Sequence, residues 1–151
     1  SKNMKINVPT AGMHLDLGEN TKAEIIAPNN NNYEDTNNYS IVLKISYGNT
    51  KFLFTGDAEK LSEKEILDKN YDISSNVLKV GHHGSSNSTS DEFLDKISPE
   101  IAIISCGENN KYGHPHKETL RKLKKRNIRI YRTDIDGTII LTSNGRDIVK
   151  K

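Results

Sequence analysis

Several residue types and patterns are rare or absent in this sequence, and each absence excludes a structural feature. It contains no tryptophan and a single cysteine, Cys106, so an internal disulfide is excluded. No run of about 18 apolar residues is present, and no stretch has the form of a signal peptide. We therefore expect neither a membrane-spanning segment nor an export signal within this chain. Cys106 lies in the apolar run IAIISCG, which predicts a buried structural thiol rather than a nucleophile.

The composition indicates one polar domain with a modest core. The chain has 151 residues, of which 33% are hydrophobic and 28% charged, with a formal net charge of +2. This weak basic excess is smaller than that of a dedicated nucleic-acid-binding domain. The length predicts a single domain over residues 1–151. Residues 1–10 carry few packing signals, and we interpret them as a linker or domain edge.

Two apolar runs between Phe52 and Ser86 each end abruptly at a glycine that precedes metal-capable side chains. FLFTG leads into Asp57, and VLKVG leads into His82 and His83. Short apolar runs bounded by glycine are typical of buried strands, and open α/β sheets build their sites at the carboxyl ends of such strands. A carboxylate with one or two imidazoles suits Zn²⁺, Mn²⁺ or Fe²⁺. In the alternative interpretation, Asp57 only caps a helix and the histidines are solvated.

The remaining pattern predicts an α/β fold with a mixed sheet and helices on one face. Strands are predicted over residues 13–17, 23–27, 41–47, 51–55, 77–80, 101–105, 128–131, 138–141 and 147–149. Helices are predicted over residues 59–69, 91–97 and 117–126. Gly48-Asn49, Asp136-Gly137 and Asn144-Gly145 are typical of hairpin turns, and the asparagine-rich residues 29–38 predict a loop.

The chain resembles the metallo-β-lactamase-fold hydrolases, in particular the soluble domain of ComEC-type competence (DNA-uptake) proteins and their free-standing relatives. Four stretches carry the resemblance: FLFTGD, VLKVGHHGSSNSTS, PEIAIISCGENNKYGHPH and YRTDIDGTIIL. It extends from about Ala11 to Val149 and implies a four-layer αββα sandwich made of two halves. It also implies a hydrolase with one or two divalent ions, Zn²⁺ or Mn²⁺, that acts on phosphodiesters of single-stranded DNA. In a ComEC-type protein the domain would lie on the extracellular face of the membrane; a free-standing relative would be secreted or cytoplasmic.

The sequence departs from this family at one important place. The family's first half carries an H-x-[HD]-x-D-H cluster that supplies most ligands of one metal, and no such string occurs here. A further family histidine is expected shortly before Ser40, where this chain has Asp35, Thr36, Asn37 and Asn38. The chain therefore resembles the second half of the domain. It is a fragment, a degenerate relative, or a chain that completes its site with another chain, and alone we expect weak metal binding and little hydrolysis.

The resemblance also implies roles for individual residues. Asp57 would bridge the metals, and His83 would be a metal ligand with His82 as its neighbour, although the two histidines can exchange these roles. His114 would protonate the leaving oxygen or hydrogen-bond a phosphate, or it is only a loop histidine packed beside Pro115. Candidates for substrate binding are Ser85, Ser86, His116 and Lys117, the alternative for the serines being ordinary turn hydrogen bonds. The predicted helix over residues 117–126 is strongly basic, which indicates either a solvated face or a track for phosphates.

Two further expectations concern partners. Apolar residues alternate along the predicted strands so that both faces of the sheet are apolar, and three helices can cover only one face. We therefore expect a homo-oligomer that pairs the uncovered faces, unless the N-terminal residues fold over them. The second function considered is a non-catalytic half-domain that binds nucleic acid or a protein partner, which the missing ligand cluster favours.

Overall fold

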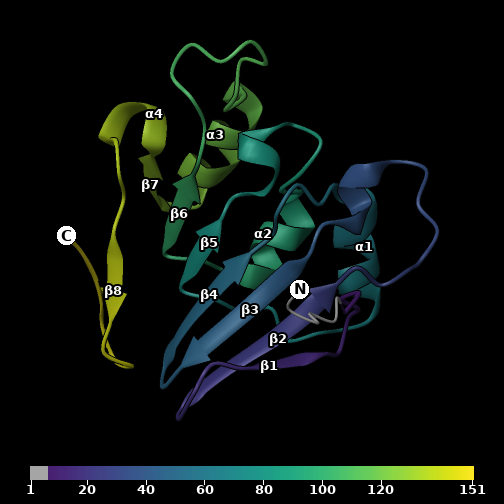
Figure 1. The fold of residues 1–151 in the computed structure, drawn as a ribbon. Helices are drawn as coiled ribbons and strands as arrows, with labels where there is room; N and C mark the ends of the chain where they lie inside the picture. The colour runs from purple at the N-terminus through teal and green to yellow at the C-terminus, as the bar shows by residue number, and fades with distance from the viewer. Residues whose placement is uncertain (1–6) are drawn as a thin grey trace, which may run out of the picture.

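A mixed seven-stranded sheet forms the framework of the protein. The computed structural model describes residues 7–151, and the part of the predicted linker that covers residues 1–6 lies outside them. The strands follow one another across the sheet in sequence order (Figure 1). They are β1 (His14–Asp16), β2 (Thr21–Ala27), β3 (Val42–Tyr47), β4 (Thr50–Phe54), β5 (Val77–Lys79), β6 (Ile101–Ile104) and β7 (Arg129–Arg132). Strands β1 to β4 pair antiparallel, and β4 to β7 pair parallel, so the predicted mixed sheet is confirmed.

The parallel half is built from three strand–helix–strand crossovers. The helices α1 (Lys60–Asp68), α2 (Asp91–Ile97) and α3 (Lys117–Lys125) lie together behind the sheet in Figure 1. Their apolar residues, such as Phe93 and Leu123, join Leu53, Leu78 and Ile104 of the strands in one buried core. The predicted arrangement of helices on one face is therefore confirmed. Within residues 7–151, no helix has the length and apolar character needed to cross a membrane.

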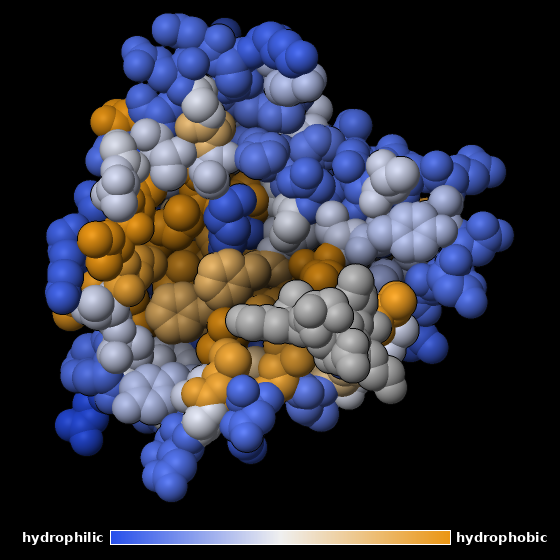
Figure 2. Space-filling view, in the orientation of Figure 1, coloured by the Kyte–Doolittle hydropathy of each residue, from blue (hydrophilic) through white to orange (hydrophobic). Residues whose placement is uncertain are grey.

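The opposite side of the sheet, which we call the open sheet face, is apolar and only partly covered. Leu43 and Ile45 of β3 lie beside Phe54 and Phe52 of β4, and these side chains remain partly accessible. A groove of about 220 Å³ runs along this face. It is lined by Phe52, Leu53, Phe54, Val77, Lys79, Ile103, Ile139 and Leu141. Figure 2 shows hydrophobic residues gathered around this hollow.

The C-terminal segment differs from the prediction at one turn and one strand, because the strand predicted over residues 138–141 begins only at Leu141. The predicted hairpin at Asp136-Gly137 is wrong, because a helical turn, α4 (Thr133–Asp136), follows β7 there. The Asp136 carboxylate accepts the backbone N–H of Arg132 at 2.7 Å, and such local side-chain hydrogen bonds compete with strand pairing. The predicted hairpin at Asn144-Gly145 is confirmed: it joins β8 (Leu141–Ser143) to β9 (Ile148–Lys150), which form a separate two-stranded sheet.

Candidate functional site

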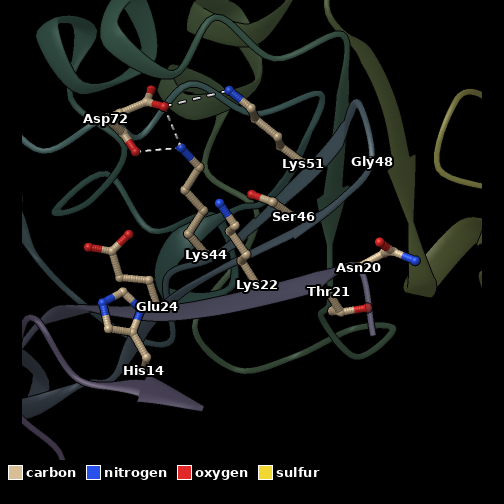
Figure 3. Close-up of a pocket in the computed structure, with 10 residues that line it drawn as sticks. All are labelled: His14, Asn20, Thr21, Lys22, Glu24, Lys44, Ser46, Gly48, Lys51 and Asp72. Atoms are coloured by element: carbon tan, nitrogen blue, oxygen red, sulfur yellow. Dashed lines mark hydrogen bonds and ion pairs between the residues drawn. The ribbon is translucent and has the colours of Figure 1, made fainter. Parts of the chain in front are cut away.

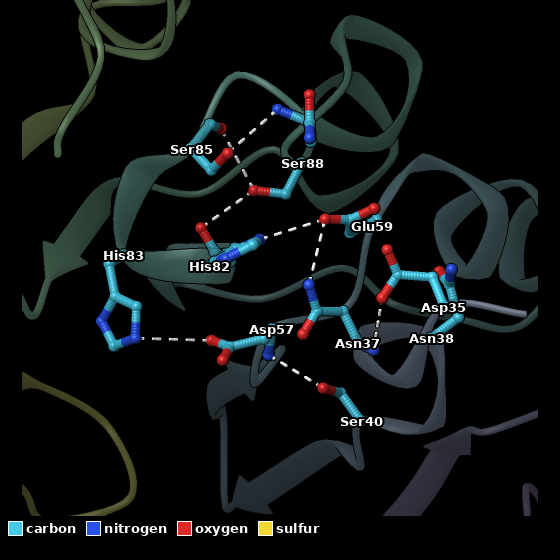
Figure 4. A network of polar contacts seen from close by, with 12 residues as sticks. Asp35, Asn37, Asn38, Ser40, Asp57, Glu59, His82, His83, Ser85 and Ser88 are labelled. Atoms are coloured by element: carbon cyan, nitrogen blue, oxygen red, sulfur yellow. Dashed lines mark hydrogen bonds and ion pairs between the residues drawn. The ribbon is translucent and has the colours of Figure 1, made fainter. Parts of the chain in front are cut away.

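Asp57 lies just past the carboxyl end of β4, at the boundary between the antiparallel and parallel halves of the sheet. Gly56 adopts a left-handed φ of +54°, which turns the chain sharply after the strand. The backbone N–H of Asp57 donates to Ser40 Oγ at 3.0 Å (Figure 4). This bond fixes the backbone of Asp57, while 43% of its side-chain surface stays exposed. Open α/β sheets commonly place reactive groups at this position.

His82 and His83 lie in a short 3₁₀ turn, η2 (Gly81–Gly84), that directly follows β5. Both histidines have left-handed backbone angles, with φ of 45° and 54°. Such angles are uncommon for residues other than glycine and are concentrated at functional sites. The backbone N–H of His82 donates to the carbonyl of Gly56 at 3.0 Å. This bond joins the η2 turn to the Asp57 turn, so the two strand ends form one site.

The orientation of His83 is set by the neighbouring strand β6. His83 Nδ1 lies 2.6 Å from the carbonyl oxygen of Ser105, which can only accept, so Nδ1 carries the proton. In the neutral ring this leaves a lone pair on Nε2, which lies 3.6 Å from Asp57 Oδ1. A backbone carbonyl that fixes the tautomer in this way is the usual support of a metal-binding imidazole.

His82 faces the other side of the turn and is largely buried. Its Nδ1 lies 3.2 Å from Glu59 Oε1, although the angle does not make an ordinary hydrogen bond. Glu59 also accepts from Asn37 Nδ2 at 3.2 Å, and Asn37 belongs to the 3₁₀ helix η1 (Thr36–Tyr39). The asparagine segment before Ser40 is thus next to the site, where the family's further histidine was expected (Figure 4).

His114 completes a cluster of imidazoles. Its ring centroid lies 5.6 Å from that of His82, 6.3 Å from that of His83 and 4.8 Å from that of His116. Burial lowers the pKa of His114, and the neighbouring imidazoles lower it further. His114 is therefore neutral near pH 7, a state in which one ring nitrogen can accept a proton and the other can donate one.

The predicted substrate-binding residues are engaged in local contacts. His116 Nδ1 accepts the backbone N–H of Ser86 at 3.0 Å, so its Nε2 carries the proton and donates to the carbonyl of Tyr112 at 3.2 Å. Ser85 Oγ accepts the backbone N–H of Asn87 at 3.3 Å. Lys117 begins α3 and is exposed. The bond between Ser86 and His116 holds the loop before α3 against the segment that follows the η2 turn.

The donor set fits part of a divalent-metal site. Asp57 and His83 supply a carboxylate oxygen and a ring nitrogen at 3.6 Å, close to the separation of about 3.3 Å between ligands that are each 2.0–2.1 Å from a tetrahedral ion. Among the described residues, however, no three side chains of the metal-binding types come together around one point. A catalytic zinc site normally has three protein ligands, so these residues alone fill only part of one.

Several residues that build this site were not predicted from the sequence. Glu59 is the neighbour of His82, and its spacing of two residues from Asp57 in the string TGDAE was the available signal. Ser40 and the Ser105 carbonyl reach Asp57 and His83 only because the fold brings distant segments together, so no sequence pattern indicated them. Lys79 lies on the open sheet face; burial lowers its pKa, while the charge of nearby Asp57 raises it.

A separate hollow of about 700 Å³ lies away from these residues, beside β1 to β4 (Figure 3). Two of its three lysines, Lys44 and Lys51, are paired with Asp72, at 3.0 and 3.5 Å from the same carboxylate oxygen. It contains one histidine, His14, which lies opposite Glu24 on the neighbouring strand. The hollow therefore offers charge pairing within the protein rather than a cluster of ligand groups.

The sequence is similar to a known protein family and to several known proteins. The family model described as the metallo-beta-lactamase superfamily matches residues 32–108, just over half of the chain, including Asp57, His82 and His83. ComE operon protein 3 of Bacillus subtilis (strain 168) is 44% identical over 115 residues, covering 76% of this chain and 15% of that protein. Competence protein ComA of Neisseria gonorrhoeae is 35% identical over 77% of this chain and 17% of its own length. Recombination protein 2 of Haemophilus influenzae is 34% identical over 77% of this chain and 14% of its own length.

The chain thus spans about a sixth of the length of these relatives. The resemblance to competence proteins inferred from the sequence motifs is confirmed by these matches. The matched segment contains both strand ends that meet at the site. The chain belongs to the metallo-beta-lactamase superfamily.

Proposed function

We propose that this chain supplies one side of a divalent-metal centre that hydrolyses phosphodiesters of DNA during DNA uptake. The observation that carries the proposal is the pair Asp57 and His83: the free Nε2 of His83 lies 3.6 Å from the Asp57 carboxylate. The hydroxyl of Ser40 holds the backbone of Asp57, and the carbonyl of Ser105 holds the ring of His83. Such second contacts limit the movement of the two residues and favour a site that is formed before an ion binds.

Each residue has a role in this proposal. Asp57 and His83 hold the ion, and a bound divalent ion supplies Lewis acidity toward a phosphoryl oxygen and lowers the pKa of water. Neutral His114, next to both histidines, would accept a proton from the attacking water at its free ring nitrogen and, as the imidazolium, would donate a proton to the leaving oxygen. His82 stays in the supporting layer, because its Nδ1 faces the Glu59 carboxylate.

The positive charge on the surface of α3 favours an anionic substrate. Lys122 pairs with Glu118, and Arg126 pairs with Asp91 and Asp95. The other basic residues of the helix make no ion pair within the described part of the chain: Lys117, Arg121, Lys124 and Lys125. These four charges follow directly after His116, so a phosphate backbone that crosses the site would continue along the helix. In a longer competence protein, we propose that the domain works on the extracellular face of the membrane.

The test is calorimetric titration of the chain with Mn²⁺ and Zn²⁺. We expect weak binding that Asp57→Ala and His83→Gln abolish, because each removes one of two donors. His14→Gln is the matched control, since His14 is an imidazole on the far strand β1 that lies opposite Glu24. Binding that survives both site substitutions, or metal density away from Asp57 in a soaked crystal, would overturn the assignment.

Catalysis by the chain alone provides the second measurement. We expect negligible hydrolysis of a phosphodiester, because the described residues bring only two metal donors together. A robust Mn²⁺-dependent turnover that Asp57→Ala abolishes would mean that the centre is already complete.

The same shortage of donors favours a second candidate, a non-catalytic half-domain that binds nucleic acid or a protein partner. The coding sequence upstream of the chain separates the two. An in-frame H-x-D-x-D-H cluster supports the metal centre, and its absence supports the binding module.

A further inference from the structure

A ladder of aromatic rings leads from the metal-binding pair to the surface. The rings of His83 and His114 are nearly parallel, with 6.3 Å between centroids and 17° between planes. The ring of Tyr112 continues the ladder, 5.7 Å from His114 with an angle of 22°. These separations lie within the range of offset-stacked aromatic pairs. Tyr112 forms the outer end of the ladder, and 65% of its surface is exposed.

The exposed ring is nevertheless held in place by its loop. Asn110 accepts the backbone N–H of His114 at 3.0 Å and donates to the carbonyl of His114 at 2.7 Å. His116 Nε2 donates to the carbonyl of Tyr112 at 3.2 Å. These side chains therefore hold the backbone from the Tyr112 carbonyl to His114. A fixed and exposed aromatic ring contributes little to the core, which points to a role in binding.

The surroundings of Tyr112 match those of a nucleobase platform. Lys111 Nζ lies over the Tyr112 ring, 5.0 Å from its centroid, so a positive charge lies at the stacking surface itself. Proteins that bind single-stranded nucleic acid combine exposed aromatic rings, which stack on bases, with cations that contact phosphates. Bases in a duplex are already stacked on one another, so such a platform favours single strands.

We propose that Tyr112 is the platform on which a base of single-stranded nucleic acid stacks beside the Asp57–His83 pair. The base binds on the exposed side of the ladder, and Lys111 contacts a neighbouring phosphate. The proposal rests on the proposed function for the position of the phosphodiester, and it adds the recognition of an unpaired base. It assigns the loop before α3 to substrate recognition and the two strand ends to chemistry.

The test uses fluorescence anisotropy with the 151-residue chain and two labelled oligonucleotides of equal length. One is oligothymidylate and the other has the same phosphates but abasic sugars. We expect the chain to prefer the oligonucleotide with bases. Tyr112→Ala should weaken binding of that oligonucleotide at least about fivefold, which corresponds to about 1 kcal/mol, the lower end for one stacked base. Binding of the abasic oligonucleotide should stay the same.

Two matched variants strengthen the result. Tyr112→Phe keeps the stacking ring and should bind as the natural chain does. Tyr47→Ala removes another exposed tyrosine, 37% accessible and on the β3–β4 hairpin, and should have no effect. Circular dichroism checks that each variant is folded.

Four outcomes would overturn the proposal. They are equal affinity of the natural chain for both oligonucleotides, equal weakening of both by Tyr112→Ala, loss of binding in Tyr112→Phe, and no binding of either oligonucleotide. Failure of the metal centre is a separate result. If metal titration shows no ion at Asp57 and His83 while the base preference still depends on Tyr112, the platform stands and the hydrolytic function falls.

Discussion

Substitution of Gly84 by alanine tests whether close packing between two loops holds the imidazole cluster together. It ends the η2 turn with a φ of +86°, and a Cβ placed on it would lie 2.6 Å from Cβ and 3.1 Å from Cα of Pro115. Pro115 separates His114 from His116, and its ring and backbone are rigid. The carbonyl of Gly84 also accepts the backbone N–H of His116 at 3.0 Å. Gly84→Ala must therefore push the His114 loop away from His83 or strain the turn.

The expected loss of stability has two parts. A left-handed backbone costs about 1–2 kcal/mol for alanine, and overpacking against a rigid neighbour costs about 1–3 kcal/mol more. Gly113→Ala is the matched control, because Gly113 has a φ of +69° but would place its Cβ in open space. It should show only the backbone part. Gly107→Ala has neither feature and should change the free energy of unfolding least.

Urea unfolding followed by circular dichroism measures these differences, with the slope of each transition checked for constancy. We expect the free energy of unfolding to fall in the order Gly107→Ala, Gly113→Ala, Gly84→Ala. Equal losses for Gly84→Ala and Gly113→Ala would show that the contact with Pro115 carries no strain. In that case the reasoning that the two loops form one tightly packed site would be refuted.

Three other predictions concern stability and assembly. Lys44 holds the pKa of Asp72 below its usual range, so the ion pair stabilises the protein above about pH 4 and is lost as the pH falls further. Asp72→Asn should cost about 1 kcal/mol at pH 7 and progressively less in acid, which urea titrations across this range measure. Burial and the hydrogen bond to Glu65 raise the pKa of Tyr33 to about 12. Tyr33→Phe should cost about 1–3 kcal/mol at pH 7, and this difference should shrink between pH 10 and 12, because the unfolded chain then releases the proton first. A constant difference in either series would contradict the assignment. Finally, we propose that the open sheet face pairs with a second copy, so sedimentation equilibrium should show self-association at tens of micromolar; a clean monomer without dye-binding apolar surface would contradict it.

The sequence predicted best those features that depend on local pattern. Glycine-bounded apolar runs predicted that Asp57 and His83 follow neighbouring strands, and parallel pairing of β4 with β5 does bring them within 3.6 Å. The three crossover helices were predicted to within about a residue because each has a regular apolar stripe. The periodicity of apolar residues and the order of the strands along the chain can both be read directly from the sequence.

Features that depend on contacts between distant segments could not be predicted. The carbonyl of Ser105 fixes the tautomer of His83 only because η2 takes left-handed angles at both histidines. The bond from Asp57 to Ser40 depends on how the asparagine-rich loop returns to the sheet. Asp136-Gly137 has the composition of a hairpin turn, but a hydrogen bond to Arg132 makes a helical turn instead. The first two interactions join segments that are far apart in the sequence, whereas the third is a local hydrogen bond that competes with the hairpin suggested by the composition.

The shortage of metal donors and the open sheet face have a common structural explanation. Phe54 and Lys79, the last residues of β4 and β5, line the apolar groove. The chain then continues from these residues directly into the turns that carry Asp57 and His83. A layer that packs against the groove would therefore reach the edge of the sheet where the two donors lie. It would bury the apolar side chains, and it could bring a carboxylate to Lys79, whose ammonium makes no ion pair within residues 7–151. The same layer is placed to supply the missing metal donors. We expect any partner that covers the open sheet face to tighten metal binding. A partner that covers this face without tightening metal binding would show that the missing metal donors and the uncovered face have different causes.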